Sequence, residues 1–477
     1  MNVLFLAAEA DPLIKIGGLG DVAGTLPIAI NAAASSLKAD LEVRVVIPYH
    51  QVIKDKSLNT TLLGRYSINS IRGPDEVLVY VYQVRGTIFY LLDGAPIQKT
   101  SGPYSPDTLL DGEKYVFFSL AALRLPAFLD WSINILHAND WHTALSVFVL
   151  KEIEQNKAIK TILSVHNLPY MGNGIDEVIT SFGIPPSNHP HLPDWARLIP
   201  LPMGLAAADA IITVSPGYAK EIITPEYGCG LEAMLQQKKQ VVSGIINGID
   251  LDIWDPAMDP LIMNHFSPSE MAGKDLNKTT LQSKLALPLN SKDPLIASIS
   301  RLDYQKGVDL LIDALYKLSP HDSWQCIILG TGDPYLEMRA RNLQADRPNH
   351  VRAVMEFDQI LAHQIYAGAD ILIMPSRYEP CGISQMISQR YGTIPLARAT
   401  GGLVDTIINS TSKLAGTGYL FEELNPTVLA SKMTRAISDY HNKAYWSEMQ
   451  QNAMAQDFSW AISAGKYIRV YEDLVTQ

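Results

Sequence analysis

Cysteine is scarce in this 477-residue sequence, and its scarcity excludes two classes of protein. The three cysteines, Cys229, Cys326 and Cys381, are too few and too scattered for a disulfide framework or a four-ligand zinc site. A reducing compartment such as the cytoplasm is therefore expected. Charged residues are also modest at 18%, whereas 47% of the residues are hydrophobic, so the chain is too apolar to be disordered and long enough for two or three cores.

Positive charge and long apolar runs are lacking as well. The formal net charge is −11, and no basic cluster is interleaved with aromatic residues, which argues against a nucleic-acid-binding surface. No apolar run is long enough to cross a bilayer, and the amino terminus "MNVLFLAAEADP" has no basic segment of the kind that precedes a signal sequence. We expect neither a nucleic acid nor a membrane as partner.

What the sequence does contain is an alternation of short β-branched runs with helical patterns. Strand-like runs in the first half are "VLFLAAEA", "EVRVVIPY", "EVLVYVYQV", "TIFYLLD", "INILHA", "IKTILSVHN" and "AIITVSP". Segments such as "EKYVFFSLAALRL" and "WHTALSVFVLKEIEQ" between them are typical of helices. This alternation predicts an α/β fold with a largely parallel sheet covered by helices on both faces.

A second series of the same kind follows "VVSGIINGIDLDIWDP". Its strand-like runs are "PLIASIS", "QCIILG", "VRAVMEF", "DILIMPS" and "TIPLARA". In "GVDLLIDALYKL", Val308, Leu311, Leu315 and Leu318 fall on one helical face, as packing on a sheet requires. We predict a first domain over residues 1–244, a second domain over 245–455, and an amphipathic helix in 456–477 that packs back towards the first domain.

The stretch "LIKIGGLGDVAGTLP" places glycines between a strand and a helix. Gly18, Gly20 and Gly24 superficially suggest a dinucleotide fingerprint, but that fingerprint starts directly at a strand end, whereas residues 11–16 intervene here. Lys15 in front of Gly17 and Gly18 instead offers a cation and bare backbone amides before a helix amino terminus, which favours an anion. The alternative is a surface turn with a solvated lysine.

Cations also follow a strand in the second half. In "SRLDYQKG", Arg301 leaves a strand end and Lys306 precedes a helix. Ligands of open α/β sheets bind outside the carboxyl ends of the strands, so both cations are expected at the binding edge. As isolated charges they would be salt-bridged or solvated.

Two further loops of the second half carry a carboxylate and glycines. In "PSRYEPCGISQ", Glu379 and Gly382 lie between a strand and a helix, where a carboxylate can accept hydrogen bonds from sugar hydroxyls. A role as charge partner of the helix amino terminus is the alternative for Glu379. "RATGGLVDTI" repeats the pattern with Gly401 and Gly402, so three consecutive loops present such residues on one edge.

Polar residues at strand ends of the first half point to the same edge. "HANDWH" and "SVHNLPYMG" place His137, Asp140, His142, His166 and Asn167 there. The histidine spacing straddles a strand-to-helix turn and lacks the one-face pattern of a helical zinc site, so no metal is expected. Neither a "G-x-S-x-G" elbow nor a Walker loop occurs, which removes hydrolase and kinase interpretations.

Taken in order, these motifs resemble the bacterial glycogen synthase and plant starch synthase family. The resemblance rests on "KIGGLGDVAGTLP", "HANDWHT", "HNLPYMG", "TVSPGYAKEI", "INGIDLDIWDP", "SRLDYQKGVDLL", "PSRYEPCGISQ" and "YGTIPLARATGGLVDTI", which run from the first strand to the last helix. It implies a GT-B architecture, two Rossmann-like domains facing each other across a cleft, with residues 1–244 as the acceptor-side domain and 245–455 as the nucleotide-sugar domain. It also implies metal-free transfer of glucose from ADP-glucose, or from UDP-glucose, to the non-reducing end of an α-1,4-glucan with retention of configuration, in the cytoplasm or the plastid stroma.

The resemblance also assigns roles residue by residue. Arg301 and Lys306 would neutralise the departing diphosphate, Glu379 would hold the sugar, and His166 would position the reacting group. Phe357, where the family commonly has tyrosine, would stack on the donor base; a core phenylalanine is the alternative. Catalytic roles fall on His166, Arg301, Lys306 and Glu379; donor binding on Lys15, Gly17, Gly18, Phe357, Gly382, Thr400, Gly401 and Gly402; the acceptor side on Asp21, Asp140 and Asn167.

The chain departs from the family pattern mainly in its first half. Lys114 and Tyr115 replace an Arg-Phe pair, Pro202 replaces a common lysine, and residues 173–200 match poorly and are expected to form a proline-rich loop. Ile16, where threonine or valine is usual, is a milder change. These departures leave open a related transferase with a sucrose-type or short maltosaccharide acceptor. A catalytically idle, glucan-binding or regulatory homologue is the remaining alternative.

Overall fold

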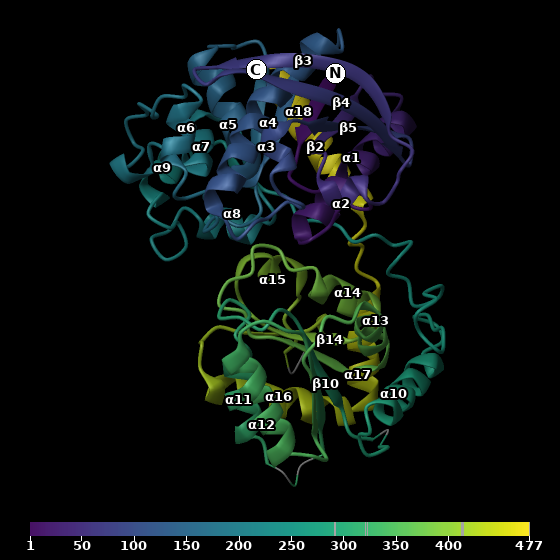
Figure 1. The fold of residues 1–477 in the computed structure, drawn as a ribbon. Coiled ribbons are helices and arrows are strands. Elements are labelled where there is room, and N and C mark those ends of the chain that lie inside the picture. Colours follow the sequence, from purple (N-terminus) through teal and green to yellow (C-terminus); the bar gives the residue numbers. More distant parts are fainter. Residues whose placement is uncertain (291, 320, 322, 412–414, 477) are drawn as a thin grey trace. The chain divides into compact units, whose positions relative to one another are not determined.

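The computed structural model describes residues 1–290, 292–319, 321, 323–411 and 415–476 and divides into two compact units (Figure 1). Unit 1 consists of Met1–Gly248 and Trp460–Gln477, and unit 2 of Ile249–Ser459. The boundaries predicted from the sequence, 244/245 and 455/456, lie slightly before the observed ones at 248/249 and 459/460. No helix of the described residues is long and apolar enough to cross a membrane.

Unit 1 is built on a sheet in which nine strands are described, in the order β3-β4-β5-β2-β1-β6-β7-β8-β9. The strands from β5 to β9 in this order are parallel, and β3 and β4 are antiparallel additions at one edge. Consecutive buried residues in β1 show that helices cover both faces of the sheet. The strands are β1 (Asn2–Leu6), β2 (Glu42–Pro48), β3 (Thr61–Ser70), β4 (Gly73–Val84), β5 (Thr87–Asp93), β6 (Ile135–Asn139), β7 (Lys160–Val165), β8 (Ala210–Thr213) and β9 (Val242–Gly244).

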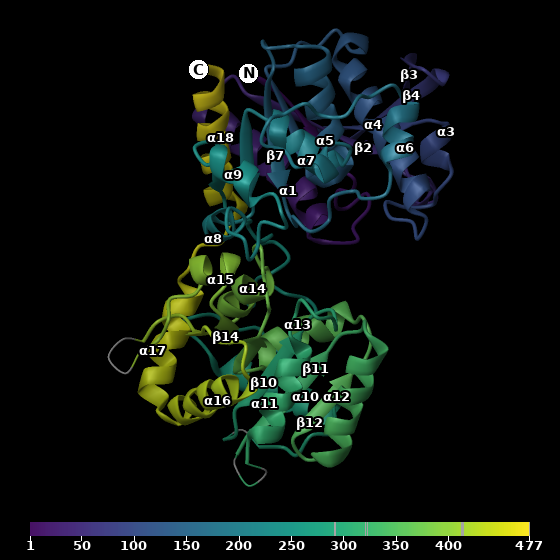
Figure 2. The same ribbon diagram turned by 90° about the vertical axis from the view of Figure 1, so that its left-hand side faces the viewer.

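The helices of unit 1 include one from the far end of the chain. Helix α18 (Trp460–Thr476) packs on α1 (Gly18–Leu37), and the Tyr471 hydroxyl lies 2.8 Å from Nδ1 of His137 in β6 (Figure 2). The chain therefore returns to complete unit 1 after forming unit 2. The other helices are α2 (Gln51–Lys54), α3 (Ala95–Gln98), α4 (Thr108–Phe128), α5 (Asp140–Phe148), α6 (Asp176–Ser181), α7 (Pro200–Ala207), α8 (Pro216–Glu221) and α9 (Glu232–Gln237), with a π-helical turn at Val149–Ile153 and a 3-10 turn at Asp194–Ala196.

Unit 2 has a sheet in which six strands are described, all parallel, in the order β12-β11-β10-β13-β14-β15. The strands are β10 (Leu295–Ile299), β11 (Gln325–Leu329), β12 (Val351–Val354), β13 (Ile371–Met374), β14 (Ile394–Arg398) and β15 (Tyr419–Phe421). The helices are α10 (Ala272–Lys284), α11 (Val308–Lys317), α12 (Pro334–Asp346), α13 (Gln359–Gly368), α14 (Ser384–Arg390), α15 (Gly401–Thr406), α16 (Pro426–His441) and α17 (Lys443–Met454).

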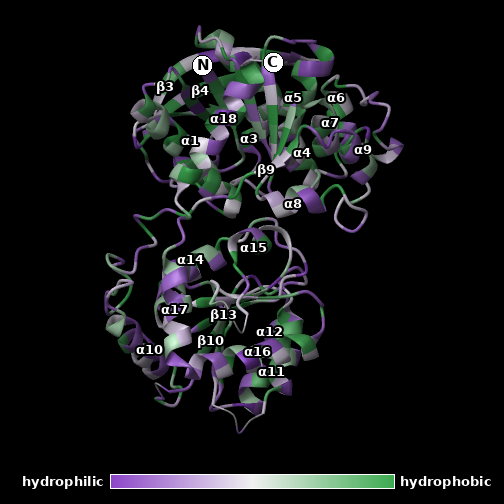
Figure 3. Cartoon of the chain, turned by 180° about the vertical axis from the view of Figure 1, so that it is seen from behind, coloured by the Kyte–Doolittle hydropathy of each residue, from purple (hydrophilic) through white to green (hydrophobic). Residues whose placement is uncertain are grey.

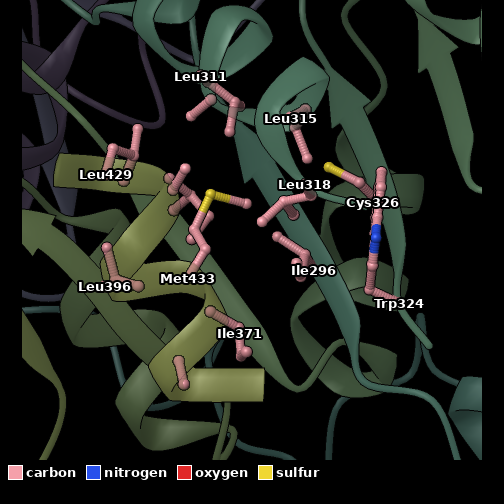
Figure 4. Close-up of a cluster of buried hydrophobic side chains, with 14 of the residues drawn as sticks. Ile296, Leu311, Leu315, Leu318, Trp324, Cys326, Ile371, Leu396, Leu429 and Met433 are labelled. Atoms are coloured by element: carbon pink, nitrogen blue, oxygen red, sulfur yellow. The ribbon is translucent and has the colours of Figure 1, made fainter. Parts of the chain in front are cut away.

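The core of unit 2 forms where helices cover this sheet. Val308, Leu311, Leu315 and Leu318 are all buried, as their helical spacing predicts. Figure 4 shows Leu315 of α11 and Met433 of α16 reaching into one cluster with Ile296 of β10. Figure 3 shows the same pattern by hydropathy, because the strands inside each unit are largely green and the outer loops largely purple.

The α/β class and the two Rossmann-like units are confirmed, and each strand-like run named from the sequence contains a strand. Strands β3, β9 and β15 were not predicted. The expectation that residues 173–200 form a loop is wrong in part. They contain α6 and a 3-10 turn, because Val178 and Ile179 supply a small buried face.

Candidate active site

A buried carboxylate holds the glycine loop that follows β1. Glu9 is fully buried and accepts hydrogen bonds from the backbone amides of Ile16 and Gly17, the latter at 3.2 Å, and from the Tyr104 hydroxyl at 3.0 Å. Burial raises the pKa of Glu9, and these hydrogen bonds oppose that rise. The loop is therefore fixed from beneath, by a side chain that follows the strand.

The residues expected to meet the donor lie on the exposed side of this loop. Lys15 is half exposed and its Nζ lies 2.5 Å from Oδ1 of Asp21, so it is an ion-paired surface residue and not simply a solvated one. A Cβ on Gly18 would meet nothing within 4 Å, whereas one on Gly24 would lie 2.2 Å from the carbonyl oxygen of Asp11. Gly24 thus serves packing, and Gly18 leaves open space beside the backbone.

The turns after β6 and β7 are joined by Asp140 and His166. The His166 amide donates to Oδ1 of Asp140 at 2.7 Å, and Asp140 has a left-handed φ of 54°. Burial raises the pKa of Asp140 to about 7, against the hydrogen bonds from the amides of His166 and Asn167. A carboxylate that titrates near neutral pH at a strand end is typical of a functional site.

His166 is held as a neutral imidazole. Burial lowers its pKa to about 4. Its Nε2 lies 2.9 Å from Oδ1 of Asn139, whose Nδ2 donates to the Leu6 carbonyl, so the amide orientation places the proton on Nε2. Nδ1 of His166 therefore carries the lone pair.

Other polar atoms at this edge have no partner among the described residues. They include the buried Oδ1 of Asn167 and the buried Nδ1 of His142. Within the same set of residues, no group of three or more histidine, cysteine, aspartate or glutamate side chains could hold a metal ion. The unpaired atoms offer hydrogen bonds to a polar ligand.

In unit 2, the loops after β10 and β13 are joined by an ion pair. Lys306 Nζ lies 2.8 and 2.7 Å from the two carboxylate oxygens of Glu379, and Ser376 donates to Oε2 at 2.9 Å. Both charged side chains are largely buried, at 19% and 6% exposure. The Glu379 carboxylate is therefore held by Lys306 and Ser376, and its alternative role as a charge partner for the start of α14 stays a prediction.

Arg301 lies on the more exposed side of the same edge. Its side chain is 61% exposed, and its guanidinium nitrogens lie 2.8 Å from Oδ2 of Asp303 and 3.2 Å from Oε1 of Gln305. Asp303 also accepts from the Lys306 amide at 2.9 Å. Arg301 is thus oriented by its own loop while its side chain remains largely exposed.

The glycine loop after β14 lies against the Glu379 turn. The Gly402 amide donates to the Glu379 carbonyl at 3.0 Å, and a Cβ on Gly402 would lie 2.2 Å from the Cys381 carbonyl. Thr400 is the N-cap of α15, which begins at Gly401, and Gly382 has a left-handed φ of 74°. These three loops follow β10, β13 and β14, which are neighbours in the sheet.

Phe357 lies between β12 and α13 and is 87% exposed. The alternative that it is a core phenylalanine is therefore wrong. Exposure of a large aromatic ring at the carboxyl edge of the sheet leaves its face available for stacking.

The structure places the predicted residues at the carboxyl edge of one sheet in each unit, with Phe357 after β12, two strands away from β10. In unit 1, the neighbouring strands β1, β6 and β7 are followed by Lys15, Gly17, Gly18, Asp21, Asp140, His166 and Asn167. In unit 2, the neighbouring strands β10, β13 and β14 are followed by Arg301, Lys306, Glu379, Gly382, Thr400, Gly401 and Gly402. Sequence reasoning missed Glu9, Asn139, Tyr104 and Ser376. The acidic residue in "AAEADP", directly after a buried strand, was the one signal present.

Comparison with known proteins supports the assignment of these motifs. The starch synthase catalytic domain family matches residues 2–237, and glycosyl transferases group 1 matches residues 281–453. A glycogen synthase of Thermodesulfovibrio yellowstonii is 37% identical over 499 residues, which cover 100% of this chain and 98% of that protein.

Solved structures give the same result. The catalytic domain of starch synthase IV from Arabidopsis thaliana, bound to ADP and acarbose, has a TM-score of 0.87 and 29% identity, with 100% of this chain and 99% of that chain covered. Sucrose-phosphate synthase from Thermosynechococcus elongatus, at 18% identity, a TM-score of 0.62 and coverage of 100% and 99%, shares the GT-B fold. Full-length identity to glycogen synthases, together with the two clustered loop sets, shows that the chain belongs to the glycogen and starch synthase family of glycosyltransferases.

Proposed function

We propose that this synthase transfers glucose from ADP-glucose to the non-reducing end of an α-1,4-glucan with retention of configuration. The observation that carries the proposal is the group of Arg301, Lys306 and Glu379 on one edge of unit 2. The ADP and acarbose in the starch synthase IV structure support a nucleotide-sugar donor and a glucan acceptor.

Breaking a glycosyl–phosphate bond leaves negative charge on the departing diphosphate. Fixed cations stabilise that charge without reorganising during the reaction. Lys306 is held by Glu379 and Arg301 by Asp303, so both are oriented before a substrate arrives. In this proposal, Glu379 also accepts hydrogen bonds from hydroxyls of the transferred glucose.

Neutral His166 positions the reacting groups in unit 1. Because burial keeps its pKa near 4, His166 supplies hydrogen bonds and not a positive charge at neutral pH. A retaining glycosidase would need two carboxyl groups about 5 to 5.5 Å apart, as nucleophile and acid. We propose instead a front-face displacement in which the leaving phosphate takes the acceptor proton, with Asp21, Asp140 and Asn167 on the acceptor side.

We further propose that the reaction needs no metal and takes place in the cytoplasm. The two cations at the carboxyl edge of unit 2 supply the charge that a metal ion provides in other phosphate chemistry. Cys229, Cys326 and Cys381 are all unpaired thiols, in keeping with a reducing compartment. Activity after treatment with a chelator and immunodetection in cell fractions would test the two statements.

The decisive experiment measures ADP and UDP release from ADP-glucose and UDP-glucose, each with and without glycogen, together with Glu379→Ala. Glycogen-dependent ADP release that disappears in the variant, with an α-1,4-linked product by NMR, is the expected result. Release only with sucrose-type or short maltosaccharide acceptors would move the assignment to a related transferase. No release from either donor by folded protein would indicate the idle homologue.

A matched pair of lysine variants separates catalysis from stability. Lys306→Ala should lower kcat, by raising the activation free energy by about 2 to 4 kcal/mol, if Lys306 stabilises the leaving group. Lys278 forms an equally short pair, 2.7 Å, with Asp370 at the opposite, amino-terminal end of β13. Lys278→Ala should lower the melting temperature and leave kcat of the remaining folded protein unchanged. Unchanged turnover in Lys306→Ala would remove the leaving-group role.

A further inference from the structure

Two buried residues of α4 stand where the family pattern has an Arg-Phe pair. Lys114 and Tyr115 are 0% and 1% exposed, and neither belongs to the loops described above. A fully buried lysine is rare in proteins unless its charge is paired and its donors are satisfied. Their contacts therefore indicate what this position of the fold requires.

Lys114 anchors the loop that precedes α4. Its Nζ lies 2.8 Å from Asp111 Oδ1, 3.0 Å from Thr100 Oγ1, and 2.9 and 2.7 Å from the carbonyls of Gly102 and Pro103. Burial lowers the pKa of Lys114, and Asp111 opposes the shift. The single ammonium of Lys114 thus contacts one carboxylate and three oxygens of residues 100–103. We call residues 100–104 the 100–104 loop.

Tyr115 acts on the same loop from the next position of the helix. Its hydroxyl donates to the Pro103 carbonyl at 2.6 Å, so this carbonyl accepts from both Lys114 and Tyr115. The Tyr115 ring also packs edge-on against His142 and Trp141, with centroids 4.6 and 5.2 Å apart. The pair therefore touches both the 100–104 loop and the turn after β6.

The 100–104 loop is connected in turn to the Lys15–Gly18 loop, which follows β1. Tyr104 follows Pro103 directly, and its hydroxyl donates to Glu9, which accepts from the amides of Ile16 and Gly17. An unbroken series of hydrogen bonds and one peptide link runs from Tyr115 to the backbone beside Lys15. A change at the buried end alters how firmly the exposed end is held.

We propose that Lys114 and Tyr115 are positioning residues that fix the Lys15–Gly18 loop through Tyr104 and Glu9. This inference rests on the proposed function, because it assumes that the loop meets the nucleotide sugar. The two departures from the family pattern are one coupled exchange. An arginine offers five donors beside a phenylalanine that offers none, whereas lysine offers three and needs the tyrosine hydroxyl as the additional donor to Pro103.

The test uses Tyr115→Phe, which keeps the ring against His142 and Trp141 and removes only the hydroxyl. Its control is Tyr66→Phe, because the Tyr66 hydroxyl also donates at 2.6 Å to a carbonyl, that of Ala121 in the same helix, away from the 100–104 loop. Both variants should lose similar stability. Only Tyr115→Phe should raise the KM for the nucleotide sugar, by about threefold to tenfold, with little change in the KM for glycogen.

Two further variants examine the coupling. Lys114→Met should lower kcat/KM for the donor on the order of a hundredfold, since the whole 100–104 loop loses its anchor. The double variant Lys114→Arg/Tyr115→Phe should restore the donor KM that Tyr115→Phe alone loses. Failure of this rescue, or equal effects of Tyr115→Phe and Tyr66→Phe on the donor KM, would overturn the proposal.

A readout independent of activity distinguishes this proposal from the proposed function. Amide hydrogen exchange of the segment 13–20 should speed up in Tyr115→Phe and in Tyr104→Phe but not in Tyr66→Phe, because the amides of Ile16 and Gly17 depend on Glu9. If exchange is faster in Tyr115→Phe and Tyr104→Phe but the unmodified chain has no transferase activity, the positioning role is upheld and the donor assignment is rejected. Unchanged exchange would reject the positioning role itself.

Discussion

Residues that are close to each other in this chain differ in what they contribute to packing and in how burial shifts their pKa values. Gly18 and Gly24 belong to the same helix and the same motif, yet only Gly24 is required by packing. Asp140 and His166 are hydrogen-bonded neighbours, yet burial shifts their pKa values in opposite directions, up to about 7 for Asp140 and down to about 4 for His166, so burial favours the neutral form of each. At the scale of the residue, function and stability can be separated by substitution.

Gly18→Ala should keep or raise stability, by up to about 1 kcal/mol, because the new methyl meets open space and alanine favours the helix. The KM for the nucleotide sugar should nevertheless rise, since the proposed donor comes close to this backbone. Gly24→Ala should instead cost about 1 to 3 kcal/mol from its clash with Asp11. Chemical unfolding and donor titration of both variants check this; a Gly18→Ala enzyme with unchanged KM would contradict close donor approach.

Asp140 should make folding less favourable as pH rises. Its pKa is raised from 3.8 to about 7 in the folded chain, so the folded state binds the proton more tightly, and stability falls between about pH 4 and pH 7 by a few kcal/mol. Asp140→Asn keeps an acceptor for the amides of His166 and Asn167 and tolerates the left-handed φ. In urea unfolding, the free energy of unfolding of Asp140→Asn should increase relative to that of the parent as pH rises. A constant difference from pH 4 to 8 would refute the shifted pKa.

His166 contributes with the opposite sign. Because its folded pKa is lowered from 6.5 to about 4, its contribution to stability is present above pH 6.5 and is lost as pH falls to 4. The pH dependence of the parent alone therefore mixes the two groups. The difference between the parent and Asp140→Asn isolates the carboxylate.

The sequence allowed the positions of the candidate loop residues to be predicted, because each follows a recognisable strand. Lys15, Arg301, Lys306 and Glu379 stand out as charges between a buried run and a helix. Glu9 and Tyr104 were missed because their contact joins positions 95 residues apart, and no local pattern contains that distance. The pairing of Lys306 with Glu379 likewise depends on β10 and β13 being neighbours in the sheet.

At the scale of the element, burial on both faces made strands easy to predict and edges hard. β1 and β10 are nearly continuous apolar runs and every residue of β6 is buried, as is typical of central parallel strands. β3 was missed because it is an edge strand with exposed leucines and a glycine, and β9 and β15 have only three residues each. Helix α18 was readable from its amphipathic pattern, but its contact with β6 through Tyr471 was not.

Tyr471→Phe tests how α18 is held on unit 1. His137 uses both ring nitrogens, with Nδ1 at 2.8 Å from the Tyr471 hydroxyl and Nε2 at 2.7 Å from Ser164. Removing the hydroxyl leaves Nδ1 buried without a partner, which should cost about 1 to 3 kcal/mol. Tyr316→Phe, which removes an exposed bond to Asp346, should cost much less in the same thermal unfolding experiment. Equal losses would mean that the buried contact does not secure the helix.

At the scale of the whole molecule, unit 2 is inserted into unit 1. The chain enters unit 2 at Ile249 and leaves it at Ser459, and these residues are bridged, with the Ile249 amide donating to the Phe458 carbonyl at 2.8 Å. On the other side of each boundary, a Cβ on Gly248 would lie 2.6 Å from the Trp460 nitrogen. In each unit, the two points at which the chain crosses the boundary therefore lie next to each other, and unit 2 has its own buried hydrophobic cluster.

A fragment of residues 249–459 should consequently fold without unit 1. We expect it to unfold cooperatively on heating, because its termini meet and its core of α11, α16 and the parallel sheet is complete within it. Leu315→Ala, which leaves a cavity at a fully buried position, should lower the free energy of unfolding of the fragment by about 2 to 5 kcal/mol. It should lower that of the unit 2 transition in the full chain by the same amount. A fragment without a cooperative transition, or one indifferent to Leu315→Ala, would show that the stability of unit 2 depends on unit 1.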